Sequence, residues 1–160
     1  MNESQYTDKQ KKAIEIARTC FLRDDNLYGC AESVYIALKT VFALENPHVS
    51  SPAIALNGGI AYSGTTCGAL TGAALAIGEM AEQLTSDHQA AKRSARTVMR
   101  DLMIAFKDRF SSYDCAALVP YDLSVPQEHA AFIASGIWRT ACMKQIEFTV
   151  AKAVELVDQV

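Results

Sequence analysis

Apolar residues recur along most of the chain with the three-to-four-residue spacing of amphipathic helices. The clearest case is the segment 7–23, where Ala13, Ile14 and Ala17 share one face and charged side chains take the other. No stretch long enough for a strand alternates apolar and polar residues. The spacing therefore predicts an all-α fold. The predicted helices cover 7–23, 27–44, 66–84, 87–110 and 126–160, the last divided near Gly136, with shorter helical turns at 52–56 and 115–118.

One uncharged stretch, 57–78, holds six of the eight glycines of the chain. Its first part predicts a loop through Gly64, because glycines adopt backbone angles closed to other residues. Its second part predicts a helix on which Gly68, Gly72 and Ala76 share one face. A face of such small residues lets a neighbouring helix approach closely. We expect five to seven helices packed around this buried Gly/Ala-rich helix.

Length and charge narrow the class of protein. The 160 residues predict a single helical domain over 1–160. A net charge of −3 argues against nucleic acid or an anionic membrane as partner. The polar N-terminal residues 1–5 lack the apolar core of a secretion signal, and the run 66–78 is shorter than a membrane span needs. We expect a cytoplasmic protein, where cysteines serve redox or metal chemistry more often than structural disulfides.

Two cysteines are predicted near the N-terminal ends of helices. With Thr65 or Thr66 as N-cap, Cys67 falls in the first helical turn, and Cys30 follows Gly29 in the same way. The helix dipole and free N–H groups there favour a thiolate, so the sequence predicts a lowered pKa for these thiols.

The other three cysteines have different surroundings. Cys115 lies near a third helix start, whereas Cys20 lies on the apolar face of its helix and is expected to be a core residue. The pattern places Cys142 in mid-helix. No CxxC pair, P-loop or GxGxxG string occurs, which leaves thiol redox chemistry or metal ligation by cysteines distant in sequence.

Several segments together resemble the C-GCAxxG-C-C family of putative redox-active proteins, which are small bacterial and archaeal chains with four characteristic cysteines. The most specific is the string Cys67-Gly68-Ala69-Leu70-Thr71-Gly72-Ala73. The other matching segments are 29–34, 58–60, 63–64 and 115–118, with Cys142. Two features depart from the family pattern: Cys20 is extra, and Asn57 stands where another small residue is expected.

The resemblance implies a redox role for Cys30, Cys67, Cys115 and Cys142, and excludes Cys20. We expect these four to converge and to act in thiol–disulfide exchange or electron transfer with an unidentified redox partner. The alternative is that the same four cysteines are ligands of a metal ion or an iron–sulfur cluster. A third interpretation is a non-enzymatic helical interaction module. The sequence leaves open whether the protein is an enzyme, whether it uses a cofactor and whether it forms a homodimer.

Overall fold

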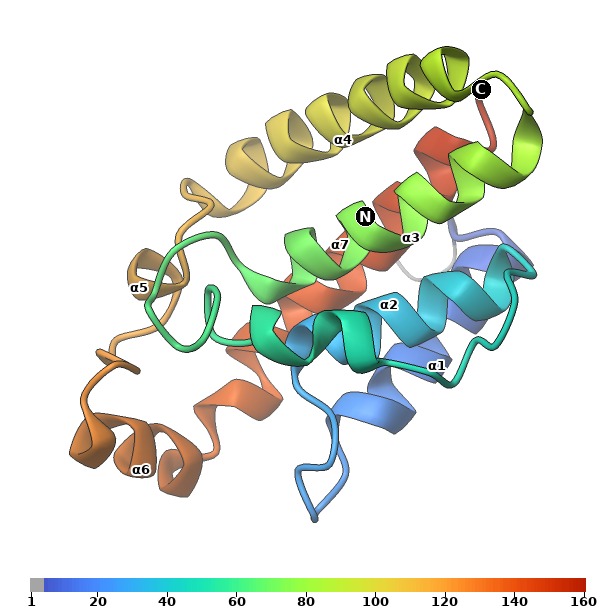
Figure 1. Ribbon diagram of the computed structural model, residues 1–160. Helices are drawn as coiled ribbons and strands as arrows, with labels where there is room; N and C mark the ends of the chain where they lie inside the picture. The colour runs from blue at the N-terminus through green and yellow to red at the C-terminus, as the bar shows by residue number, and fades with distance from the viewer. Residues whose placement is uncertain (1–4) are drawn as a thin grey trace.

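The computed structural model describes residues 5–160, which form helices joined by loops (Figure 1). No strand occurs among these residues, and one isolated bridge pairs Thr66 with Asp114. The all-α expectation is therefore confirmed. The longer helices are α1 (Asp8–Phe21), α2 (Cys30–Val41), α3 (Gly68–Leu84), α4 (His88–Phe110), α6 (Pro126–Ser135) and α7 (Ala141–Val157). The short ones are η2 (Ser51–Leu56), α5 (Cys115–Leu118) and η3 (Ile137–Arg139).

The helices pack side by side around a core that α7 shares with four others. Helix α2 contacts both α1 and α3, while α7 contacts α1, α2, α3 and α4. Figure 1 shows α4 along the upper edge of the molecule and α6 set apart at the lower left, with α5 between them. This arrangement brings the start of α2, the start of α3 and the segment before α7 toward the end where α5 and α6 lie.

The helix boundaries follow signals in the sequence. Thr7 caps α1 and forms a capping box with Gln10, and the Asp87 side chain caps α4 by accepting from the Gln89 N–H. Pro126 is the first residue of α6, where its missing N–H is no loss. No helix in residues 5–160 combines the length and apolar character needed to cross a membrane. Residues 1–4, which carry most of the N-terminal segment judged not to be a secretion signal, lie outside the described part.

Glycines on α3 allow α2 to approach closely. A Cβ atom on Gly72 would overlap the backbone carbonyl of Ala31, and one on Gly68 would overlap the Sγ atom of Cys30. The outer side of α3 is exposed at Ala74 and Glu79, so the helix is not enclosed on every side. The close approach nevertheless sets the first turn of α2 against the start of α3.

The loop between η2 and α3 has an uncommon backbone. The five consecutive residues 58–62 all have positive φ, and only the first two are glycines. The left-handed region costs a residue with a Cβ atom about 1–2 kcal/mol, and Ile60, Ala61 and Tyr62 all adopt it. Such conformations persist where surrounding contacts hold them, and they concentrate at functional sites. Here the loop is held by backbone bonds that include Ala61 N–H to the Ala55 carbonyl at 2.8 Å.

Candidate functional site

Four cysteines lie at the N-terminal ends of four helices. Cys30 and Cys115 are the first residues of α2 and α5, Cys67 is the N-cap of α3, and Cys142 is the second residue of α7. Cys20 is different, because it is the second-to-last residue of α1. Four helix starts from distant parts of the chain thus carry the same residue type.

Two of these positions correct the sequence analysis. Cys142 is not in mid-helix: Gly136 takes a left-handed conformation with φ of 69°, which ends α6, and a new helix starts at Ala141. Cys67 does not follow a threonine cap but is itself the N-cap. The Thr65 hydroxyl is engaged elsewhere, since it donates to the Gly59 carbonyl at 2.7 Å.

Three of the cysteines line one cavity. Cys30, Cys115 and Cys142 all border a space of about 380 Å³ between the starts of α2, α5 and α7 and helix α6. Cys67 lies beside it, held by a short antiparallel contact with the segment before α5. In that contact the Cys67 N–H donates to the Tyr113 carbonyl at 2.8 Å, and the Cys115 N–H donates to the Thr65 carbonyl at 2.7 Å.

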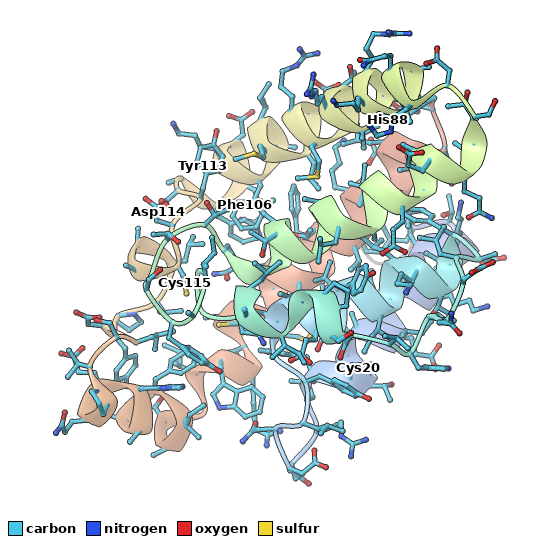
Figure 2. All side chains as sticks on the ribbon, viewed as in Figure 1. Cys20, His88, Phe106, Tyr113, Asp114 and Cys115 are labelled. Atoms are coloured by element: carbon cyan, nitrogen blue, oxygen red, sulfur yellow. The ribbon has the colours of Figure 1, made fainter. Side chains whose placement is uncertain are left out.

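Cys20 lies away from this group. Figure 2 shows Cys20 on α1 and Cys115 at α5, well separated in the view. Cys20 is not among the described residues that border the cavity. Its thiol is partly buried, and this burial raises its pKa, with Arg23 opposing the shift.

Burial keeps the thiols of the site protonated at neutral pH. It raises the pKa of Cys115 to about 12, and it raises the pKa values of Cys67 and Cys142 as well. The lowered pKa that the sequence predicts for Cys67 and Cys30 is therefore wrong, because burial raises the pKa of both thiols. The Cys67 side chain is only 4% exposed, and desolvation outweighs the helix N-terminus that favours its thiolate.

The thiols are close enough to influence one another electrostatically. A negative charge on Cys30 further raises the pKa values of Cys67, Cys115 and Cys142. A charge on Cys115 does the same for Cys67 and Cys142. Ionisation of one thiol therefore disfavours ionisation of the others, as expected for a cluster.

Cys30 has the surroundings best suited to carry a thiolate. Burial raises its pKa, but the backbone N–H groups of Gly58, Ala31, Cys30 itself and Gly68 point at its sulfur and oppose that shift. The residue is partly exposed, in contrast to the buried Cys67 and Cys115. Successive N–H groups that converge on one atom form an anion-binding concavity, here supplied by the α2 start, the left-handed loop and the α3 start.

Asn57 holds the start of α2 in place, a role the sequence analysis missed. Its Oδ1 atom accepts from the Ala31 N–H at 3.0 Å and lies 3.9 Å from the Cys30 sulfur. Its Nδ2 atom donates to the buried carboxylate of Glu32 at 3.0 Å, which also accepts from the Gly29 N–H at 2.9 Å. The departure from a small residue at Asn57 thus has a structural reason. A capping-box spacing from Gly29 to Glu32 was the available signal.

A second polar contact orients Cys67. Its Sγ atom donates to the Oε1 atom of Gln145 on α7 at 3.6 Å, and both side chains are buried. A buried polar residue on the apolar face of a helix is kept there by a hydrogen-bond partner. Gln145 therefore stabilises the protonated form of Cys67 and ties α7 to the start of α3.

The metal alternative has no preformed site among the described residues. In residues 5–160 no group of three or more histidine, cysteine, aspartate or glutamate side chains is arranged to hold a metal ion. The arrangement of the cysteines can instead supply one thiol to react and neighbouring thiols to resolve the product.

The molecule is thus an all-helical protein that gathers four cysteines at the starts of four helices. The family model described as "Putative redox-active protein (C_GCAxxG_C_C)" matches residues 28–156, and the chain belongs to that family. All four cysteines of the site lie inside the matched region, and Cys20 lies outside it. No curated protein and no solved structure matches the chain.

Proposed function

We propose that the protein is a thiol–disulfide redox protein that works through Cys30, Cys67, Cys115 and Cys142. The observation that carries the proposal is the shared cavity: three cysteines from three different helix starts line it, and the fourth lies beside it. Core-filling cysteines have no reason to occupy four helix N-termini. Family membership supports a redox role in general.

Cys30 is the nucleophile in this proposal. Four backbone N–H groups favour its thiolate, and its partial exposure gives a partner access. The thiolate attacks a disulfide of the partner, and Cys115 or Cys142 then resolves the mixed disulfide across the cavity. Cys67, which is buried and bonded to Gln145, tunes the site and does not attack. Five free cysteines suit a reducing compartment, so we place the protein in the cytoplasm.

Controlled oxidation tests the proposal. Reduced, chelator-treated protein is oxidised with diamide, the remaining thiols are alkylated, and the peptides are mapped by mass spectrometry. We expect one intramolecular disulfide joining two of Cys30, Cys115 and Cys142, while Cys20 stays reduced. Cys20→Ser is the matched control and should form the same disulfide, whereas Cys30→Ser should not attack a disulfide partner.

Two outcomes would decide against the proposal. Oxidation of Cys20 as readily as the other cysteines, or the absence of an intramolecular disulfide in folded protein, would favour buried structural thiols. Stoichiometric iron or zinc in the purified protein, measured by elemental analysis, would favour the metal alternative with the same four ligands.

A further inference from the structure

The walls of the cysteine-lined cavity are mostly aromatic and aliphatic. A volume of about 380 Å³ falls within the range of roughly 300–1,000 Å³ typical of small-molecule sites. Phe21 and Trp138 form one part of the wall, with an edge-to-face contact at 5.4 Å between ring centroids. The rings of Tyr62 of the left-handed loop and His129 of α6 are in tilted contact, with 4.4 Å between their centroids. The other apolar or aromatic residues in the wall are Leu27, Tyr28, Ile54, Leu123, Phe132 and Ile133.

The cavity has no permanently charged cation in its wall. Among the described residues that border it there is no lysine or arginine, its one base is His129, and its one carboxylate is that of Glu32. Two arginines lie just outside and are paired with carboxylates. Arg139, whose guanidinium covers the Trp138 ring, bonds to Asp24, and Arg23 bonds to Asp25.

Exposed apolar side chains gather at the rim of the cavity. Leu27, Ile54, Tyr62 and Ile133 are exposed, and all four border the cavity. They come from four different segments: the loop before α2, helix η2, the left-handed loop and helix α6. An apolar rim around a concave site marks a place where an apolar ligand enters.

We propose that this cavity is the substrate site and that its substrate class is small, uncharged, apolar disulfides, with anionic disulfides excluded. The inference rests on the proposed thiol–disulfide function and adds the chemical nature of the partner. An anionic ligand would lose its hydration in a cavity that has no lysine or arginine, because the N–H groups at Cys30 already face that residue's own sulfur, and this loss is costly. An uncharged aromatic ligand instead gains contact with the rings of the wall.

The reaction balances without any further reagent. The Cys30 thiolate attacks one sulfur of the ligand disulfide, which forms a mixed disulfide and releases half of the ligand as a thiol. Cys115 or Cys142 then attacks the Cys30 sulfur and closes a protein disulfide, while its thiol proton passes to the second half of the ligand, which leaves as a thiol. Two protein thiols are oxidised to one disulfide, and the ligand disulfide is reduced to two thiols.

Two aromatic disulfide reagents, one uncharged and one dianionic, test the inference. Dithiodipyridine is uncharged at neutral pH, whereas dithiobis(nitrobenzoate) is a dianion, and each releases a coloured thiol. The rate of each with the reduced protein is divided by its rate with free cysteine, which removes intrinsic reactivity. We expect the normalised rate at the cavity thiols to favour dithiodipyridine by about tenfold or more, because the dianion must be desolvated.

A matched pair of lysine substitutions locates the effect. Ile54→Lys places a cation at the rim, while Ile104→Lys places the same charge on α4, away from the cavity; the two isoleucines are 60% and 52% exposed. Both variants change the net charge equally, and circular dichroism confirms their folding. Ile54→Lys should raise the rate with the dianion about fivefold through a screened Coulomb attraction, and Ile104→Lys should leave it unchanged.

The results distinguish a failure of the uncharged-substrate inference from a failure of the proposed redox function. Equal normalised rates for the two reagents, with a protein disulfide still formed, would overturn the uncharged-substrate inference and leave the redox function standing. Equal responses of Ile54→Lys and Ile104→Lys would also overturn it. Failure of both reagents to produce a protein disulfide would overturn the proposed function and the inference together.

Discussion

At the scale of single residues, the pKa of each cysteine in the site depends on which of two opposing effects prevails. A helix N-terminus favours the thiolate, whereas burial favours the thiol. For Cys67, Cys115 and Cys142 burial prevails. Burial prevails at Cys30 too, but there the N–H groups of the left-handed loop and of α3 add to those of its own helix and oppose the rise in pKa. The reactive position is therefore set by the loop as much as by the helix.

Alkylation rates test this ranking. In reduced protein near neutral pH, iodoacetamide should modify Cys30 before Cys67, because Cys30 is partly exposed and surrounded by N–H donors while Cys67 is 4% exposed and bonded to Gln145. Time-resolved peptide mass spectrometry gives the order. Faster modification of Cys67 would show that the N-cap position, and not the N–H cluster, controls reactivity.

Asn57 provides a second test at this scale. Asn57→Ala removes the acceptor for the Ala31 N–H and the donor to Glu32, both buried, so it should lower the free energy of unfolding by about 1–3 kcal/mol. It should also slow alkylation of Cys30, because the start of α2 is no longer held against the loop. Urea unfolding and the alkylation assay measure the two effects. Unchanged stability together with unchanged Cys30 reactivity would remove the positioning role.

At the scale of helices, the sequence predicted those boundaries that local signals specify. Thr7 and Asp87 are side-chain caps, Pro126 starts its helix, and Gly136 divides the last helical region. The start of α3 was predicted one or two residues too early, with Thr65 or Thr66 in place of Cys67 as its cap, because a tertiary contact decided it. The bridge from Thr66 to Asp114 keeps the chain extended up to Cys67, and no local pattern encodes that pairing.

Two glycines on α3 give a matched test of helix packing. Gly72→Ala would press a methyl group against the Ala31 carbonyl, so it should destabilise the fold by about 1–3 kcal/mol. Gly78 has no atom within 4 Å of its would-be Cβ, so Gly78→Ala should stabilise by about 0.5–1 kcal/mol through reduced backbone entropy. Chemical unfolding of both variants measures the difference. The same sign of effect at both positions would contradict the close α2–α3 packing.

At the scale of the whole molecule, the site is a product of long-range packing. Successive cysteines of the site are up to 48 residues apart in the sequence. The resemblance to a family identified the four residues but did not show where they lie in the fold. Their meeting depends on α3 lying against α2 and on the segment before α5 pairing with the segment before α3. Neither the cavity nor its apolar rim has a sequence signal of its own, because its residues come from several separate segments.

The buried thiols make the stability of the whole molecule sensitive to alkali. The pKa of Cys115 is about 12 in the folded protein against 9.0 as the ordinary value, and the pKa values of Cys67 and Cys142 are raised as well. For a group whose pKa is higher in the folded state, the stabilisation is complete below the unfolded pKa and is lost as pH rises toward the folded pKa. Each such group lowers the free energy of unfolding by about 1.4 kcal/mol per pH unit in that window.

We therefore expect these thiols to leave the free energy of unfolding constant up to about pH 8 and to make it fall steeply above pH 9. Urea unfolding of reduced protein at a series of pH values measures the slope. Cys115→Ala should lose part of the slope between pH 9 and pH 12, because one of the titrating groups is gone. Cys20→Ala, the control, removes a partly exposed thiol outside the cluster and should change the slope less. Equal alkaline slopes for the wild-type protein and Cys115→Ala would mean that the Cys115 thiol ionises freely in the folded state, and the cavity would then have to be far more hydrated than its walls indicate.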